Sequence, residues 1–471
     1  MTRRVELLAL LLADALALMG ANLLWHKARF EWEWFSDPVN VPVPALVWIV
    51  VLALSMGWLV VFLFFGMYRE RYASSRFDEF VSLAKVVTIG ILVMFFFLFI
   101  DQLDAYAARS NLVFYWFAVF GLVALGRFVV RSVQKFLILR GKGLHRALVV
   151  GWDDRLGQLY RDVAAYPEAG LEIVGAIQLS HGGDGVAARG PDGSVMQAGN
   201  DIADLPRLID ELQVQDVLIA LGAGDQDPLL EVLRLCDGKP VRLKLVPDFY
   251  SVIGGMARTE HMYGLPLIEV MPEPMAAWEE STKRLIDLVA SGIVLVVGAP
   301  VWLAIGLAVR LTSSGPAIYR QQRVGKLGRV FTMYKFRTMR QDAEAETGPV
   351  WATEDDPRYT AVGRWLRKTR LDEIPQFWNV FKGDMSLVGP RPERPYFVEK
   401  LAAEIPLYNR RHRVKPGITG WAQVKWKYDT SLDDVRQKVK YDLFYIENLG
   451  LRRDLQILLR TITTALKGSG Q

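Results

Sequence analysis

Long apolar runs separated by short polar stretches dominate the first part of the chain. Four of them, near residues 5–24, 44–66, 84–100 and 111–130, each have about the ~20 residues that a helix needs to cross the hydrocarbon of a bilayer. The polar loops between them are too short to form a domain of their own. The pattern predicts four transmembrane helices over residues 1–140.

The positive charges in the loops predict the orientation of these helices. Basic residues precede the first run, lie between the second and third, and begin again at Arg127 after the fourth. The two remaining loops carry no such excess. Because loops rich in Lys and Arg stay in the cytoplasm, we expect both ends of the four-helix bundle to face that side.

From about residue 145 the pattern changes to short β-rich runs alternating with helical stretches, which is typical of a parallel sheet in an α/β domain. The first run ends at Gly151, but Asp153 and Leu156 occupy the places where a dinucleotide-binding turn needs two further glycines. An acidic side chain there would repel a pyrophosphate. We expect residues 145–270 to form a Rossmann-like domain without an intact dinucleotide motif, structural or regulatory in role; an NAD-dependent domain is the alternative.

A fifth apolar run, from Lys283 to Arg310, is long enough to span the bilayer, yet basic residues flank both of its ends. A true crossing would place one basic flank outside, against the charge rule. Pro300 lies near the middle of the run and lacks the N–H that a straight helix needs. We therefore predict a re-entrant membrane helix over residues 281–310, broken at Ala299–Pro300, with a Pro-kinked spanning helix as the alternative. Ala299 has no hydroxyl to satisfy the freed carbonyl, so the bend should depend on proline and packing alone.

Composition and charge agree with a membrane protein. Hydrophobic residues make up 51% of the chain, and the mean hydropathy of +0.17 is high for a soluble protein. The net charge of +5 gathers beside apolar segments, which favours anionic lipid headgroups over nucleic acid. We expect Lys283, Arg284 and Asp287 to anchor the fifth run at the interface, with Asp287 spaced to pair with either base. The single cysteine, Cys236, excludes an internal disulfide and a Cys-rich metal cluster.

The most informative polar stretch is RKTRLDEIPQFWNVFKGDMSLVGPRP, residues 367–392. Asp372 and Glu373 can hold a divalent cation and still offer an anionic oxygen to phosphorus. Arg367, Arg370 and Arg391 can neutralise phosphate oxygens as planar forks. The stretch therefore indicates a phosphate-handling active site.

The acid pair also has a plain structural interpretation, as the acidic first turn of a helix with Thr369 in a capping position. The two interpretations are compatible, because the start of a helix also turns backbone N–H groups towards a phosphate. Other basic side chains could contact either phosphate or lipid headgroups. These candidates are Arg320, Arg323, Lys335 and Arg337.

Two further motifs accompany this stretch, YRQQRVGKLGRVFTMYKFRTM at residues 319–339 and VKPGITGWAQV at residues 414–424. Together the three motifs, in this order, resemble the bacterial sugar transferase family of polyprenyl-phosphate hexose-1-phosphate transferases. These large monotopic phosphoglycosyl transferases begin exopolysaccharide and O-antigen synthesis. The resemblance is strongest from about residue 280 onward and implies a mainly helical catalytic domain over residues 311–471, on the cytoplasmic face of the bacterial inner membrane.

The resemblance also implies a reaction, in which a sugar 1-phosphate moves from a UDP-sugar to undecaprenyl phosphate and UMP is released. Asp372 would attack the β-phosphorus and form a covalent phosphosugar, while Glu373 would hold Mg²⁺. Two alternatives remain open: direct in-line transfer with both carboxylates on the metal, and a non-enzymatic membrane scaffold of a polysaccharide export complex. The α/β domain would most simply support a homodimer. The sugar cannot be read from the sequence.

Overall fold

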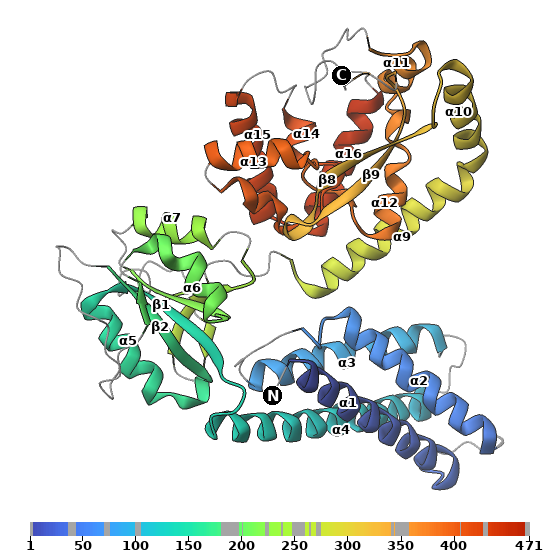
Figure 1. Ribbon diagram of the computed structural model, residues 1–471. Coiled ribbons are helices and arrows are strands. Elements are labelled where there is room, and N and C mark those ends of the chain that lie inside the picture. The colour runs from blue at the N-terminus through green and yellow to red at the C-terminus, as the bar shows by residue number, and fades with distance from the viewer. Residues whose placement is uncertain are drawn as a thin grey trace. The chain divides into compact units, whose positions relative to one another are not determined.

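The computed structural model describes residues 3–35, 44–69, 76–98, 105–179, 197–199, 201–221, 226–236, 239–246, 260–262, 265–269, 275–340, 343, 358–405, 407–426 and 432–466. The chain divides into two compact units (Figure 1). The first contains residues 1–236 and 240–272, and the second contains residues 237–239 and 273–471.

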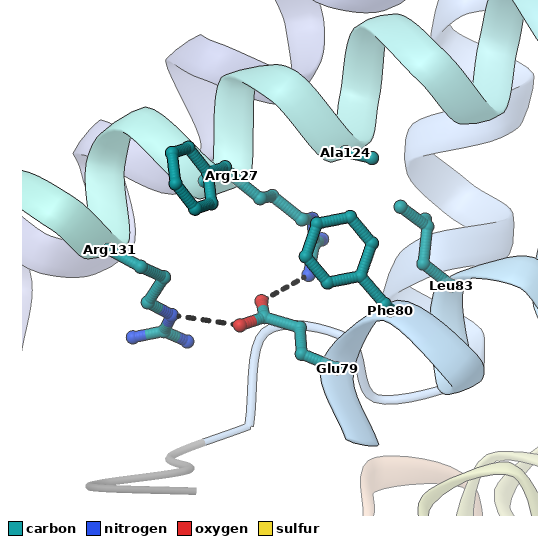
Figure 2. A pocket seen from close by; sticks show the side chains of 7 residues that line it. Glu79, Phe80, Leu83, Ala124, Arg127 and Arg131 are labelled. Atoms are coloured by element: carbon teal, nitrogen blue, oxygen red, sulfur yellow. Dashed lines mark hydrogen bonds and ion pairs between the residues drawn. The ribbon is translucent and has the colours of Figure 1, made fainter. Parts of the chain in front are cut away.

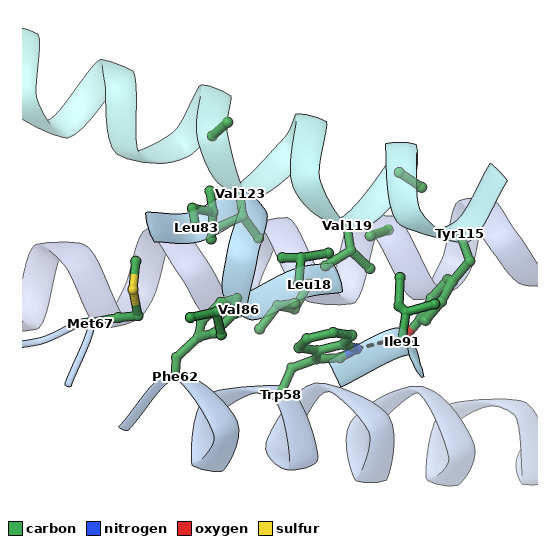
Figure 3. Close-up of a cluster of buried hydrophobic side chains, with 14 residues drawn as sticks. Leu18, Trp58, Phe62, Met67, Leu83, Val86, Ile91, Tyr115, Val119 and Val123 are labelled. Atoms are coloured by element: carbon green, nitrogen blue, oxygen red, sulfur yellow. Dashed lines mark hydrogen bonds between the residues drawn. The ribbon is translucent and has the colours of Figure 1, made fainter. Parts of the chain in front are cut away.

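Four long apolar helices form the N-terminal part of the first unit and fit a membrane bundle. They are α1 (Arg3–His26), α2 (Pro44–Phe64), α3 (Arg76–Leu98) and α4 (Ala105–Leu139). Each is long and apolar enough to cross a bilayer, as the sequence predicted. Figure 3 shows the core between them, where the Trp58 indole donates to the Tyr115 hydroxyl at 2.9 Å and that hydroxyl donates to Asn22 at 2.7 Å. Buried polar groups in this core are therefore satisfied by one another, as a lipid environment requires.

A network of buried charges joins α1, α3 and α4, and Figure 2 shows the part of it between α3 and α4. Arg127 donates to both carboxylate oxygens of Asp14, at 3.0 and 2.6 Å, and to Glu79 at 3.1 Å. Arg131 contacts the second oxygen of Glu79 at 3.0 Å and Glu6 at 2.6 Å. Our placement of Arg127 in a loop was therefore wrong, because α4 extends to Leu139 and buries that side chain. Each arginine is paired, as a charge at membrane depth must be.

The pocket in Figure 2 lies against this network, between α3 and α4. Phe80, Leu83, Ala124 and Phe128 line it beside the charged side chains. Both arginines here use their donors on carboxylates, so the pocket offers little to an anion.

A mixed α/β domain follows. Its strands are β1 (His145–Trp152), β2 (Leu171–Leu179), β3 (Gln197–Gly199), β4 (Asp216–Ala220), β5 (Arg242–Leu245), β6 (Glu260–Met262) and β7 (Leu265–Glu269). Their order is β3-β2-β1-β4-β5-β7-β6. The helices α5 (Asp153–Ala165), α6 (Leu205–Glu211) and α7 (Gln226–Leu235) belong to the same domain.

The sheet differs from the all-parallel one that we expected. Pairing is parallel from β3 to β5, but β7 runs antiparallel to β5 and β6 antiparallel to β7. Only two residues separate β6 from β7, which is too short for the crossover that a parallel pair needs. Gly151 has a structural reason: a Cβ there would lie 2.6 Å from the carbonyl oxygen of Ala220, so β1 and β4 could not approach each other.

The second unit is mainly helical with two small sheets. Its helices are α9 (Ala277–Val297), α10 (Ala299–Thr312), α11 (Ala361–Lys368), α12 (Gln376–Lys382), α13 (Pro395–Glu404), α14 (Trp421–Lys425), α15 (Leu432–Glu447) and α16 (Leu451–Leu466). One sheet pairs β8 (Ile318–Val324) with β9 (Val330–Phe336) in antiparallel fashion, and the other pairs β10 (Ser386–Val388) with β11 (Gly417–Thr419) in parallel.

The fifth apolar run is bent by 63° between α9 and α10, at the place the sequence indicated. Gly298 separates the two helices, and Pro300 occupies the first turn of α10. The bend does not depend on proline and packing alone, as we had expected: the Trp302 indole donates to the carbonyl oxygen of Val294 at 2.8 Å across the break. A Cβ on Gly298 would lie 2.2 Å from that indole nitrogen, so glycine is needed for the bond to form.

Candidate active site

The acid pair lies on a short 3-10 turn, η5 (Leu371–Glu373), and not in the first turn of an α-helix. Thr369 does not cap this turn, because its hydroxyl donates backwards to the carbonyl oxygen of Trp365 at 2.9 Å. The residue that precedes the turn is Arg370, whose φ of +56° is left-handed. Non-glycine residues seldom adopt this conformation, and they are concentrated at functional sites.

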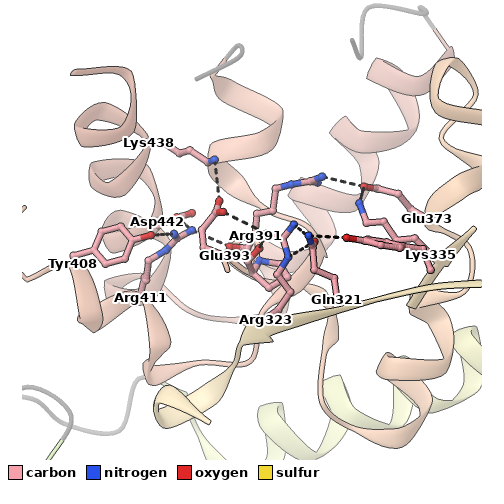
Figure 4. Close-up of polar contacts among 12 residues, drawn as sticks. Gln321, Arg323, Lys335, Glu373, Arg391, Glu393, Tyr408, Arg411, Lys438 and Asp442 are labelled. Atoms are coloured by element: carbon pink, nitrogen blue, oxygen red, sulfur yellow. Dashed lines mark hydrogen bonds and ion pairs between the residues drawn. The ribbon is translucent and has the colours of Figure 1, made fainter. Parts of the chain in front are cut away.

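Glu373 is clamped by two cations (Figure 4). Its Oε1 accepts from Lys335 Nζ on β9 at 3.0 Å and from Arg391 Nη2 in the Gly-Pro-Arg-Pro loop at 3.0 Å. Burial alone would raise the pKa of Glu373, but Lys335 and Arg391 outweigh it and hold that pKa well below its usual range. Glu373 therefore stays ionised at any physiological pH.

Asp372 has the opposite environment. It is 8% exposed, and within the described part of the chain no hydrogen bond to its carboxylate is formed. Burial raises its pKa to about 6, with Lys335 opposing the shift and Glu373 adding to it. Two adjacent carboxylates with pKa values displaced in opposite directions are typical of a catalytic pair, in which one group supplies fixed charge and the other reacts.

Arg367, on α11, lies close enough to lower the pKa of Asp372 against the effect of burial. Its guanidinium donates to the Tyr359 hydroxyl and lies 4.7 Å from the centre of the Tyr359 ring. The structure thus brings three of the candidate phosphate ligands, Lys335, Arg367 and Arg391, together around the acid pair.

Three other predicted phosphate ligands are placed differently. Arg337 donates to the carbonyl oxygens of Ser313 and Ser314, both at 2.7 Å, and so holds the segment after α10. Arg323 donates to the Pro392 carbonyl at 2.9 Å, which fixes the Gly-Pro-Arg-Pro loop. Arg320 is exposed on β8. The first two therefore shape the site through backbone carbonyls.

The predicted anchors at the start of the fifth run reach two other segments, β10 and the end of α12. Lys283 donates to the carbonyl of Val388 at 2.9 Å, and Arg284 donates to two carbonyls at the end of α12. Asp287 accepts the backbone N–H of Leu387 at 2.9 Å instead of bonding to either base along the helix. These contacts join α9 to the strand that precedes the Gly-Pro-Arg-Pro loop.

One buried network near the site was missed by the sequence reasoning. Arg411 donates to the backbone carbonyl of Arg391 at 3.0 Å, to Asp442 at 2.8 Å and to the Tyr408 hydroxyl at 2.7 Å (Figure 4). Arg411 and Asp442 are both almost fully buried. In the sequence Arg411 belongs to the basic run NRRHR, which has the pattern of a surface patch. Its acidic partner lies 31 residues further on, so no local pattern shows the pair.

A second part of the same network holds the residues that follow Arg391. Glu393 lies 3.4 Å from Arg323 and 3.7 Å from Lys438 on α15. Burial acts to raise the pKa of Glu393, but Lys438 and Arg323 hold it below its usual range. The Gly-Pro-Arg-Pro loop is thus fixed from two sides by ion pairs, which limits the freedom of the Arg391 side chain at its centre.

The four apolar N-terminal helices fit a membrane bundle, and the buried acid pair among cations has the features of a catalytic site. Comparison with known proteins agrees. The family model described as "Bacterial sugar transferase" matches residues 278–468, and one described as "CoA-binding domain" matches residues 63–247.

Several characterised relatives resemble the chain over most of its length. A UDP-glucose:undecaprenyl-phosphate glucose-1-phosphate transferase of Escherichia coli is 34% identical, covering 74% of each chain. One of the same name from Xanthomonas campestris is 32% identical over 90% of this chain and 88% of the relative. The chain belongs to the bacterial sugar transferase family.

A further relative resembles part of the chain more strongly. The UDP-N-acetylgalactosamine-undecaprenyl-phosphate N-acetylgalactosaminephosphotransferase of Aeromonas hydrophila is 44% identical over 225 residues. The match covers 48% of this chain and spans about half of the relative, 52% of its length. Relatives named for glucose and for N-acetylgalactosamine therefore both match the chain, so these matches do not reveal its sugar.

Proposed function

We propose that this enzyme transfers a sugar 1-phosphate from a UDP-sugar to undecaprenyl phosphate, which gives undecaprenyl diphosphosugar and UMP. The observation that carries the proposal is the acid pair, with Asp372 buried and poised near neutrality and Glu373 fixed as an anion among cations. The names of the relatives support the substrates. The reaction would be the first membrane step of exopolysaccharide or O-antigen synthesis.

The proposed route has two displacements at phosphorus. The Asp372 carboxylate attacks the β-phosphorus, a new O–P bond forms, and the bond to the UMP oxygen breaks. A phosphate oxygen of undecaprenyl phosphate then attacks the same phosphorus, and the bond to Asp372 breaks. The covalent phosphosugar lets a soluble donor and a lipid acceptor react in turn. Direct in-line transfer is the alternative, and it predicts no labelled protein.

The basic side chains around the pair would neutralise the phosphates. Arg367 and Arg391 present planar forks, and Lys335 supplies a compact charge. Arg391 and Lys335 each use one contact on Glu373, which fixes their direction before substrate arrives. Such preorganised charge is the main contribution that a protein makes to phosphoryl transfer.

The donor set also fits Mg²⁺. Among the described residues no three His, Cys, Asp or Glu side chains converge, but one or two carboxylates suffice for Mg²⁺ when substrate phosphates and water complete its shell. Glu373 accepts from both cations through Oε1, so Oε2 is the oxygen that would bind the metal ion. When bound, Mg²⁺ would stabilise the negative charge on the leaving UMP.

We further propose that α9 and α10 form a re-entrant hairpin in the bacterial inner membrane, which keeps the second unit on the cytoplasmic face. The 63° bend supports this geometry. Apolar side chains of α9 and α10 are among the most exposed large hydrophobic residues that the structure describes, including Val296 at 76%, Leu303 at 75% and Leu311 at 77%. Exposed apolar surface of this kind requires a lipid cover. A homodimer formed through the α/β domain is part of the same proposal.

A UMP-release assay with the purified full-length protein, undecaprenyl phosphate and a panel of UDP-sugars tests the reaction. We expect UMP with one or a few of the donors, and a labelled phosphosugar bound to the protein when the acceptor is omitted. Asp372→Asn should abolish both signals. Absence of UMP with every donor would favour the membrane scaffold, and turnover without labelled protein would favour direct transfer.

A further inference from the structure

Two cations converge on a glycine at the far end of α12. A Cβ built on Gly383 would lie 3.3 Å from Arg284 Nη2 and 3.6 Å from Lys415 Nζ. Gly383 has a φ of +101° and ends α12, so a side chain is disfavoured there for reasons of backbone as well as space. The absence of a side chain lets a guanidinium and an ammonium group both lie beside Gly383, and we call this place the Gly383 site.

Positively charged side chains outnumber acidic ones around the Gly383 site. The charged groups that face Lys415 are Arg284, Lys326, Glu280 and Asp287. Glu280 is engaged by Lys326 at 3.5 Å, and Asp287 accepts a backbone N–H. Within the described residues no carboxylate forms an ion pair with Lys415. The three cations Lys415, Arg284 and Lys326 therefore exceed the two acids by one positive charge at the Gly383 site.

The donors of Arg284 are only partly used. It donates through Nη1 to the Val380 carbonyl at 2.6 Å and through Nη2 to the Phe381 carbonyl at 2.7 Å. Each of these nitrogens carries a second hydrogen. Burial and the nearby Arg284 charge lower the pKa of Lys415, so an anion placed between the two groups would relieve their repulsion.

Two exposed aromatic side chains lie on α12, whose last carbonyls accept from Arg284. Trp378 and Phe381 stack with their ring centres 5.8 Å apart, and both remain largely exposed. The Phe381 ring lies 3.8 Å from a Cβ built on Gly292 of α9. Gly292 is eight residues beyond Arg284, about 12 Å along the helix. α9 then continues with exposed apolar residues towards Val296.

We propose that Arg284 and Lys415 bind the phosphate of an anionic membrane phospholipid at Gly383, and that an acyl chain of this lipid lies along Phe381 and Trp378. The order of charge followed by apolar surface along α9 matches the order of headgroup and tail in such a lipid. This inference rests on the membrane geometry proposed for α9, and it does not depend on the reaction.

The site is separate from the acid pair. Asp372 precedes the start of α12, whereas Gly383 follows its end, and the seven residues of the helix span about 10 Å. The proposed occupant is therefore a bulk phospholipid and not the acceptor in the act of transfer.

The test is native mass spectrometry of the full-length protein in detergent, titrated with phosphatidylglycerol and, separately, with zwitterionic phosphatidylcholine. We expect the first phosphatidylglycerol to bind more tightly than phosphatidylcholine. Lys415→Gln should weaken that binding about tenfold, the value of one strong charge-assisted hydrogen bond. Lys415→Arg should retain it. The matched control is Lys382→Gln, which removes an exposed lysine from the end of the same helix.

Three outcomes would overturn the proposal. The first is unchanged phosphatidylglycerol binding in Lys415→Gln. The second is an equal loss in Lys382→Gln, which would show a diffuse surface charge effect. The third is a raised KM for undecaprenyl phosphate in Lys415→Gln, which would assign the Gly383 site to the acceptor. Because binding is measured without turnover, failure of the proposed reaction would leave the result interpretable.

Discussion

The two adjacent carboxylates should respond in opposite directions when their charge is removed. Burial raises the pKa of Asp372 from 3.8 to about 6, so its ionised form destabilises the folded state above that pH. A shift of roughly two units, at about 1.4 kcal/mol each, corresponds to about 3 kcal/mol. Asp372→Asn should therefore raise the free energy of unfolding at neutral pH by up to about 3 kcal/mol while it abolishes turnover.

The difference in free energy of unfolding between Asp372→Asn and wild type should depend on pH. The destabilisation by ionised Asp372 is fully present above about pH 6 and disappears as the pH falls below the unfolded value of 3.8. The advantage of Asp372→Asn over wild type should thus shrink between those limits. Thermal unfolding of both proteins, followed in the same detergent across this range, measures the difference. An advantage that is absent at neutral pH, or that persists unchanged at about pH 4, would refute the reasoning.

Glu373→Gln is the matched comparison, because it changes the neighbouring carboxylate by the same single atom. The pKa of Glu373 is lowered by Lys335 and Arg391 despite burial, so its charge stabilises the fold. Removal of that charge leaves both cations without their anion, at a cost of about 3 kcal/mol. Equal effects of the two substitutions would show that the two environments do not differ as described.

Three other predictions concern the turnover rate, the residues that hold the active site in place, and the membrane topology. Turnover should fall as the pH drops through about 6, because protonated Asp372 cannot attack phosphorus; a pH profile of kcat that is flat down to about pH 5 would exclude this role. Arg411→Met should lower kcat at least about tenfold by releasing the Arg391 backbone, whereas the exposed Arg436→Met should not; equal kcat values would remove Arg411 from the support of the site. Single cysteines at Lys142 and Arg329, in a Cys236→Ser background, should both resist an impermeant thiol reagent in intact cells. Labelling at Arg329 alone would show that α9 and α10 cross the membrane.

The parts that the sequence predicted well depend on local pattern. Four apolar runs predicted α1 to α4, and the bend lies beside Pro300 because a proline is disfavoured inside a helix but tolerated in its first turn. The grouping of Arg367 and Arg391 around the acid pair could be predicted because all four residues lie within one stretch of chain. What the sequence did not show depends on distant partners. Arg337 looked like a phosphate ligand until Ser313 and Ser314 were found to take its donors.

The same reason explains the misplacement of Arg127 and the oversight of Arg411. Arg127 lies at the end of an apolar run and Arg411 lies in a basic run, and each is buried beside an acid far away in the chain, at Asp14 and Asp442. Only the fold brings such pairs together. The antiparallel edge of the sheet was also missed, although the two-residue gap between β6 and β7 was visible in the sequence and excluded a crossover.

The charge network of the four-helix bundle constrains the order in which its helices insert into the membrane during synthesis. Asp14 and Arg127 are 113 residues apart, so α1 leaves the ribosome long before its partner on α4 exists. An unpaired carboxylate inside a bilayer is costly, and among the described residues made before Arg127 it is the Tyr68 hydroxyl, just after α2, that donates to Asp14. The first helix should therefore remain at the translocon or at the membrane surface until α4 emerges. Insertion of the bundle is then a single late event, and truncation before Arg127 should leave α1 exposed to quality-control proteolysis.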